Sequence, residues 1–214
     1  MKYRTIYIDP PWPEIGGGVI KRGADRHYNV MSVADIVALP IKQLADQEGA
    51  HLYLWATNNH LNSAFRCLDA WGFEYITTIT WFKNGKIGLG QYYRGRTEHC
   101  LFASTTKKLP YKIIDGIRQQ GVTGFMAARR EHSTKPEEMR TMIENVSYAP
   151  RIEIFARRRY PFWDAAGDGI GIPLAQVFGQ ADETPVADIL AIDDCIKQKQ
   201  EHFIYRDLFS ESYN

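Results

Sequence analysis

Short apolar runs alternate with amphipathic segments through the first three-quarters of the chain. Tyr3–Asp9 has the pattern of a buried strand that ends in a carboxylate. Ser32 and Asp35 have the spacing of a helix-capping pair, and they open a helix through Ile36 that Pro40 interrupts. This alternation of strand and helix patterns predicts an α/β fold with a largely parallel sheet.

The same periodicities predict the later elements. Two Gly-rich stretches, residues 13–31 and 84–97, are expected to be loops, and residues 105–123 show no clear pattern. The remaining predictions are a strand at His51–Trp55, a helix carrying Leu61 to Leu68 and closed by Gly72, strands at Tyr75–Phe82, His99–Ala103 and Phe125–Ala128, a helix opened by a capping box of Thr134 and Glu137, and a strand at Arg151–Ala156.

Charge divides the chain into two parts. Residues 1–160 hold 23 Lys and Arg against 15 Asp and Glu, a net +8, whereas residues 161–214 hold 3 against 10, a net −7. A basic body indicates a polyanionic partner, although solvated surface charge can segregate in the same way. We therefore expect a domain at 1–170 and an acidic, partly helical extension at 171–214, available for contact with a second copy or a partner protein.

Cysteine usage and hydropathy indicate the compartment. Cys67, Cys100 and Cys195 are odd in number and widely spaced, which is typical of free thiols in a reducing cytoplasm. They lack the spacing of a zinc site. The sequence contains no run of 18 apolar residues, so we expect no membrane span. A cytoplasmic location is the resulting expectation.

The candidate chemistry lies in Asp9-Pro10-Pro11-Trp12, directly after the first strand. Ligands of open α/β sheets bind at the carboxyl ends of strands. Asp9 can accept a hydrogen bond from an amino group, and the Pro10 carbonyl can accept a second one because Pro11 restricts Pro10 to an extended backbone. Two such acceptors would localise the lone pair of adenine's amino nitrogen and stabilise the charge that develops on methylation. Trp12 could stack on the base.

Each of these residues also has a purely structural interpretation. An Asp at a strand end often forms a turn or caps a helix, Pro-Pro often forms a rigid turn, and Trp12 could belong to the core. The glycines 85, 88 and 90 resemble a phosphate cradle, but no Gly-Lys-Ser/Thr ending follows them, which favours a flexible substrate loop.

Asp-Pro-Pro-Trp is the catalytic signature of amino-methyltransferases that act on adenine. From Tyr3 to about Gly169, the chain resembles the family that includes the catalytic subunit of the eukaryotic mRNA N6-adenosine methyltransferase. The resemblance implies a Rossmann-like, S-adenosylmethionine-dependent methyltransferase fold in permuted order, with the catalytic strand first and the cofactor-binding elements late. The matching stretches are I-Y-I-D-P-P-W at 6–12, L-Y-L-W-A-T at 52–57, T-W-F-K at 80–83, G-R-T-E-H-C-L at 95–101, R-E-H-S-T-K-P-E-E at 130–138 and R-I-E-I-F-A-R at 151–157.

The resemblance also implies positions for the cofactor contacts, which fall on Lys135, Arg157 and Asp168. Ser133 lies beside Lys135, and Phe155 lies on the strand before Arg157, where it could equally be core. Lys135 could pair with the carboxylate of S-adenosylmethionine, and Arg157 and Asp168 could bond its ribose hydroxyls. The family's eukaryotic enzyme has an amide pair where this chain has Asp-Gly, so we assign the glycine no role.

The substrate candidates are Tyr28, Arg94, Arg96, Glu98 and His99. Tyr28 could cover the target base or merely pack. Glu98 and His99 could orient the nucleotide, with a salt bridge from Glu98 to Arg94 or Arg96 as the alternative. The two arginines suit phosphates, although either could be ordinary surface charge. This chemistry requires no metal.

We therefore expect an adenine-specific DNA methyltransferase that uses S-adenosylmethionine. DNA is favoured over RNA by analogy with small prokaryotic members of the family. One alternative is a catalytically silent nucleic-acid-binding subunit of the same fold. Another is methylation of the cytosine amino group or of a small molecule, but cytosine enzymes more often carry Ser at the position of Asp9.

Overall fold

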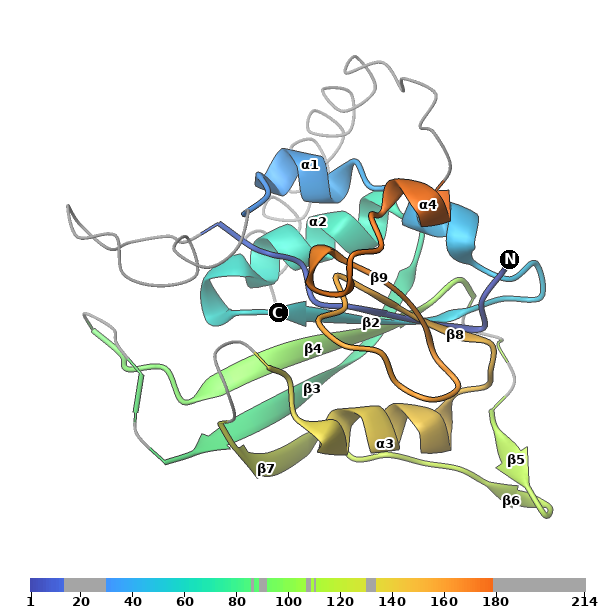
Figure 1. Ribbon diagram of the computed structural model, residues 1–214. Coiled ribbons are helices and arrows are strands. Elements are labelled where there is room, and N and C mark those ends of the chain that lie inside the picture. The colour runs from blue at the N-terminus through green and yellow to red at the C-terminus, as the bar shows by residue number, and fades with distance from the viewer. Residues whose placement is uncertain are drawn as a thin grey trace, which may run out of the picture. The chain divides into compact units, whose positions relative to one another are not determined.

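A computed structural model describes residues 1–13, 30–85, 87–88, 92–106, 109, 111–129 and 134–178. All the elements below belong to a compact unit, Met1–Gly179, and the second unit, Gln180–Asn214, lies outside the described residues. The elements (Figure 1) are β1 (Thr5–Ile8), α1 (Val33–Val37), η2 (Ile41–Leu44), β2 (His51–Ala56), η3 (Asn58–His60), α2 (Leu61–Ala70), β3 (Glu74–Asn84), β4 (Thr97–Ser104), β5 (Ile113–Ile114), β6 (Ile117–Arg118), β7 (Gly124–Ala128), α3 (Glu137–Val146), β8 (Arg151–Ile154), β9 (Asp164–Ala166), η4 (Asp168–Ile170) and α4 (Ala175–Phe178).

Seven of the described strands form one sheet in the order β7-β3-β4-β2-β1-β8-β9. β1 pairs in parallel with β2 and with β8, so that Ile8 lies between Leu54 and Ile154. β4 is the reversed strand and runs antiparallel to both β2 and β3. The expected α/β class with a mostly parallel sheet is confirmed. Because the late strand β8 lies directly beside β1, elements far apart in sequence meet there, as the permuted order requires.

Helices cover both faces of the sheet (Figure 1). α1, α2 and α4 lie on one face and α3 on the other. β2 is buried along its whole length, and its side chains alternate between the two cores: Leu52 and Leu54 join the core under α2, whereas Tyr53 and Trp55 join the core under α3. This two-sided burial explains why β2 reads as a nearly continuous apolar run.

The predicted helix cap is present at the start of α1 but not at the start of α3. The hydroxyl of Ser32 accepts a hydrogen bond from the Asp35 N–H at 3.1 Å, which confirms the capping pair of α1. The predicted capping box of Thr134 and Glu137 is wrong. α3 begins at Glu137, and its N-cap residue, Pro136, makes no side-chain hydrogen bond to the helix. The Glu137 carboxylate instead accepts a hydrogen bond from the Tyr160 hydroxyl at 2.7 Å.

Residues 105–123 contain a small hairpin that the periodicity did not reveal. Ile113–Ile114 and Ile117–Arg118 pair across the two-residue turn Asp115-Gly116, and both turn residues have positive φ. Asp-Gly is a strong signal for this turn type. It was missed because each strand has only two residues and therefore shows no alternation.

The described part of the predicted extension, residues 171–178, belongs to the first unit. Ile172, Leu174, Val177 and Phe178 lie against the core that contains Ile36. None of the helices in the described residues is both long and apolar enough to cross a membrane. The extension's boundary at 170 stays a prediction, and residues 179–214 lie outside the described residues.

Candidate active site

Four buried charges meet at the carboxyl edge of the sheet. Asp9 directly follows β1, and the reversed direction of β4 brings Glu98, near the start of that strand, to the same edge. The Nζ atom of Lys135 lies 2.7 Å from Oδ1 of Asp9 and 2.9 Å from Oε1 of Glu98. The Nζ atom of Lys83 lies 2.7 Å from Oε2 of Glu98. We call Asp9, Glu98, Lys83 and Lys135 the Asp9 cluster.

The Asp9 cluster balances two carboxylates against two ammonium groups. Its side chains are only 10% to 18% exposed, and buried charges of this kind are tolerated when each has a close partner. Burial raises the pKa of Asp9 above its usual value, although Lys135 opposes the rise. Burial alone would also raise the pKa of Glu98, but Lys135 and Lys83 together lower it to about 2. The neighbouring lysines therefore offset the effect of burial on the pKa of Glu98 but not fully on that of Asp9.

Two tryptophans hold the ammonium groups in place. The Nζ atom of Lys135 lies 5.4 Å from the ring centre of Trp55, and that of Lys83 lies 4.9 Å from the ring centre of Trp81. Such cation–π contacts favour a fixed ammonium position over a hydrated, mobile one. Both rings are buried in the core.

The backbone of the Asp-Pro-Pro-Trp segment is fixed by hydrogen bonds. The Trp12 N–H donates to the Pro10 carbonyl at 2.8 Å, and the Met31 N–H donates to the Pro11 carbonyl at 3.1 Å. A carbonyl oxygen has two lone pairs, so Pro10 retains one for an incoming amino group. The carbonyl predicted to be the second acceptor is thus held in a set orientation.

The Trp12 side chain is packed in the core, in line with its structural interpretation. Its side chain is buried, its Nε1–H donates to the Trp55 carbonyl at 2.9 Å, and its ring stacks on His60 with centres 5.1 Å apart. The His60 ring in turn contacts the Pro13 carbonyl at 2.6 Å. With one face covered by His60, the ring is part of the core, and base stacking by Trp12 stays a prediction.

The cofactor candidates in the described residues lie beside β1. Arg157 follows β8, and its charge contributes to lowering the pKa of Asp9 against the effect of burial. Asp168 is exposed at the first position of η4. Gly169 lets η4 approach closely, because a Cβ there would lie 2.8 Å from the Cα of Arg157. Phe155 is half-buried and packs against the core under α2, and Ser133 lies outside the described residues.

Among the substrate candidates, Glu98 and His99 lie on β4, whereas Arg94 and Arg96 lie in the loop before it. His99 bonds Thr80 Oγ1 at 3.0 Å and Asn58 Oδ1 at 2.8 Å, and as the neighbour of Glu98 on a strand it points to the opposite face of the sheet. The alternative salt bridge from Glu98 to Arg94 or Arg96 is wrong, because Glu98 pairs with the two lysines of the Asp9 cluster.

The two arginines lie in the loop before Glu98. Arg94 is exposed and donates hydrogen bonds to the carbonyls of Gly88 and Ile87, so it closes the loop as well as offering charge. Arg96 is exposed. Tyr28 lies outside the described residues.

Lys83 is the site residue that sequence reasoning missed. It was quoted within the T-W-F-K match but given no role. Trp81 lies opposite Glu98 in the β3–β4 ladder, and Lys83, two residues further on, points to the same face. The sequence could have indicated this pair only if the antiparallel register of β3 and β4 had been known.

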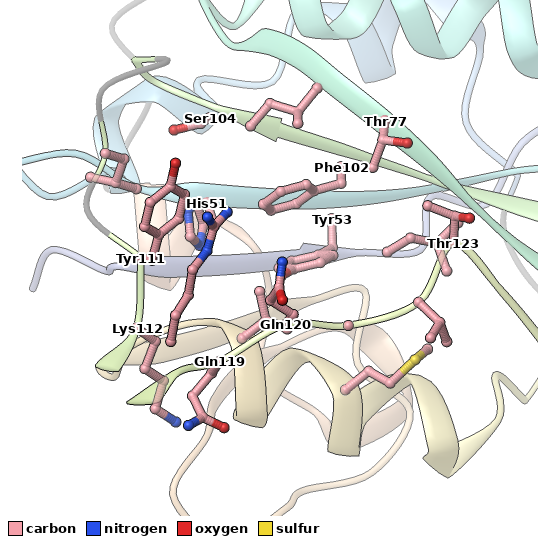
Figure 2. A pocket seen from close by; sticks show the side chains of 18 of the residues that line it. His51, Tyr53, Thr77, Phe102, Ser104, Tyr111, Lys112, Gln119, Gln120 and Thr123 are labelled. Carbon is pink, nitrogen blue, oxygen red and sulfur yellow. The ribbon is translucent and has the colours of Figure 1, made fainter. Parts of the chain in front are cut away.

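A cavity of about 580 Å³ lies at the opposite edge of the sheet (Figure 2). It is bordered by His51 at the start of β2 and Ser104 at the end of β4, whereas Asp9 lies at the other ends of these strands. Within it, His51 Nδ1 and the Tyr53 hydroxyl each contact Ser147 Oγ at 2.8 Å. None of the predicted site residues lines this cavity, so it is separate from the Asp9 cluster.

Fold and site together define a class of protein. A Rossmann-like sheet carries Asp-Pro-Pro-Trp at the carboxyl end of an interior strand, and two of the predicted cofactor residues, Phe155 and Arg157, follow the strand beside it, which is the arrangement of a methyltransferase domain. A family model described as MT-A70 matches residues 3–169, and the chain belongs to this family. The resemblance stated from the sequence motifs is thereby confirmed.

Individual relatives differ in how much of their length is matched. The chain is 28% identical over 185 residues to the human N(6)-adenosine-methyltransferase catalytic subunit METTL3, a match that covers 79% of this chain and 29% of the human protein. It is 27% identical over 168 residues to a probable N(6)-adenosine-methyltransferase MT-A70-like protein of Oryza sativa, covering 73% and 21%. It is 25% identical over 185 residues to the Type II methyltransferase M.MunI of Mycoplasma sp, covering 78% and 77%. The chain thus spans less than a third of the length of these eukaryotic relatives.

Proposed function

We propose that the chain is an S-adenosylmethionine-dependent methyltransferase that transfers a methyl group to the N6 amino group of adenine in DNA. The observation that carries this proposal is the placement of Asp9. Its carboxylate lies at the ligand-binding edge of an MT-A70 fold, in a buried charged cluster.

The choice of DNA follows from relative size. M.MunI and this chain match over more than three-quarters of both lengths, which supports a compact enzyme of that kind. The eukaryotic relatives are named for adenosine methylation and support RNA as the alternative polymer.

The residues beside Asp9 fit the proposed cofactor. Arg157 and the exposed Asp168 provide a donor and an acceptor suited to ribose hydroxyls, and Lys135 provides a cation for a carboxylate. When bound, S-adenosylmethionine supplies an electrophilic methyl group on a positively charged sulfur. No metal ligand is needed for this transfer.

Asp9 and Pro10 would then act on the amino group. One N–H donates to the Asp9 carboxylate and the other to the free lone pair of the Pro10 carbonyl, which increases electron density on the nitrogen. The raised pKa of Asp9 makes it a stronger acceptor than an exposed aspartate. Lys135 contacts Oδ1 of Asp9, and the second carboxylate oxygen can accept the hydrogen bond from the amino group.

A methyl-transfer assay tests the proposal. The full chain is incubated with radiolabelled S-adenosylmethionine and with adenine-containing DNA or RNA, and the label in each polymer is counted. We expect incorporation into DNA, and Asp9→Asn should reduce it by at least 100-fold because the amide cannot provide the same acceptor charge. Asp69→Asn, at an exposed position of α2, is the matched control and should retain full activity.

Each outcome has a distinct meaning. Transfer to RNA alone would mean that RNA, and not DNA, is the substrate. Transfer to neither polymer would contradict the proposal and favour the catalytically silent, nucleic-acid-binding subunit.

A further inference from the structure

The loop between β3 and β4 presents two adjacent tyrosines to solvent. Tyr92 is 93% exposed and Tyr93 is 92% exposed. The loop leaves β3 and enters β4 on the side of the sheet where β2 ends, which is the side of the Asp9 cluster (Figure 1). Two large rings with almost no protein contact contribute little to folding, so their exposure needs a functional explanation.

The loop is braced close to these rings. The Gly88 N–H donates to the Gly95 carbonyl at 2.9 Å. The Arg94 guanidinium donates to the carbonyls of Gly88 at 3.0 Å and Ile87 at 3.2 Å. These bonds link residues 87 and 88 to residues 94 and 95, next to the tyrosines, so less conformational entropy is lost when a ligand covers the rings.

Three arginines lie on or near the same loop. Arg94 directly follows Tyr93 and Arg96 lies three residues after it, and both are exposed. Arg129 follows β7 and approaches the same loop, because a Cβ on Gly88 would lie 3.1 Å from its Nη2 atom. Aromatic faces combined with guanidinium groups are the composition of surfaces that bind single-stranded nucleic acid, where bases stack on rings and phosphates meet cations.

We propose that Tyr92 and Tyr93 form a stacking platform for unpaired bases of the substrate strand next to the target adenine. This inference rests on the proposed function and specifies its substrate as a strand that is unpaired at this point. Bases in a duplex already stack on one another and cannot cover exposed side-chain rings, whereas unpaired bases can. Only Thr97 separates the end of the loop from Glu98, so the platform and the Asp9 cluster lie at the same edge of the sheet.

Binding measured without turnover tests the platform. Fluorescence anisotropy of the full chain is recorded with labelled oligo-dT, which contains no target adenine, and with a mixed-sequence duplex of equal length. We expect the double variant Tyr92→Ala/Tyr93→Ala to lose roughly tenfold or more in affinity for oligo-dT, since stacking on one ring is worth roughly 1–3 kcal/mol. Tyr92→Phe/Tyr93→Phe keeps both rings and should bind like the wild type.

A matched control removes an exposed tyrosine elsewhere. Tyr111 is 57% exposed and lies near the cavity at the opposite edge of the sheet, so Tyr111→Ala should leave oligo-dT binding unchanged. S-adenosylmethionine binding, measured by calorimetry, should be equal in all variants and reports that they are folded.

The outcomes separate the two proposals. If the alanine pair binds oligo-dT like the wild type, or if it loses duplex binding to the same extent, the platform is overturned while the methyltransferase proposal stands. If the wild type binds S-adenosylmethionine but neither polymer, the proposed function fails as well.

Discussion

The ammonium of Lys135 is an ion-pair partner of Asp9 within the Asp9 cluster. It bridges Asp9 and Glu98 at 2.7 and 2.9 Å, whereas Glu98 has a second partner in Lys83. Removing Lys135 would therefore affect Asp9 more than Glu98. The pairing also opposes the rise that burial causes in the pKa of Asp9.

We predict that Lys135→Met moves the acid limb of the pH–rate profile to higher pH. A protonated Asp9 is a weaker acceptor and no longer offsets the charge that develops on the amino nitrogen, so activity is lost as the pH falls through its pKa. Burial raises that pKa and Lys135 opposes the rise, so without Lys135 the loss begins at a higher pH. Single-turnover rates between pH 5 and 9 measure the shift, with Lys42→Met as a control outside the Asp9 cluster. An unchanged acid limb would mean that Lys135 does not control the ionisation of Asp9.

At the scale of elements, the sequence predicted those with a clear periodicity. β1, β2 and β8 were predicted from their apolar runs, and α2 from its helical spacing, because each element buries a face whose period is visible in the sequence. The direction of β4, the hairpin at Ile113–Arg118 and the start of α3 at Glu137 were not predicted. These depend on pairing partners or on one or two residues, which no periodicity reports.

The sequence likewise predicted only part of the candidate site. Asp9 and Lys135 were identified from motif positions, and the structure brings them into contact. The partners of Glu98 were not identified, because they follow from the register of two strands. Trp12 was ambiguous in the sequence, since stacking on a base and packing in a core require the same residue type.

The turn before η4 gives a prediction at the element scale. A Cβ on Gly167 would lie 2.5 Å from the Ala156 carbonyl oxygen and 2.6 Å from its nitrogen, so the turn or the end of β8 must shift. We expect Gly167→Ala to lower the free energy of unfolding by roughly 1–3 kcal/mol, as overpacking does, and to weaken S-adenosylmethionine binding by displacing Asp168. Urea denaturation and calorimetry measure these effects. Gly95→Ala, where a Cβ would have no neighbour within 4 Å, should be neutral, and equal effects in both variants would refute the explanation.

At the scale of the whole molecule, the two edges of the sheet have different chemistry. The carboxyl edge holds ion pairs, whereas the opposite edge holds the cavity with a buried, uncharged His51. Burial and the charge of Arg4 lower the pKa of His51 to about 4. Protonation of His51 therefore opposes folding.

We predict a loss of stability in mild acid that depends on His51. The unfolded histidine takes up a proton near pH 6.5, but the folded one does so only near pH 4. The neutral His51 therefore costs no stability above pH 6.5. As the pH falls from 6.5 to 4, the free energy of unfolding decreases by about 3 kcal/mol, at 1.36 kcal/mol per pKa unit. Urea unfolding from pH 7 to 4 should show a shallower decrease for His51→Gln than for the wild type. Parallel curves would show that another group titrates.

The reversed direction of β4 makes the segment between residues 85 and 96 a connection between two neighbouring strands. The segment between residues 85 and 96 is anchored at both ends by neighbouring, hydrogen-bonded strands, and the ladder that fixes Lys83 against Glu98 lies outside that segment. Residues can therefore be inserted, deleted or exchanged there without moving the acid or its counter-ions. We expect engineered transplants of this segment between related enzymes to transfer sequence preference while leaving the rate of the methylation step unchanged.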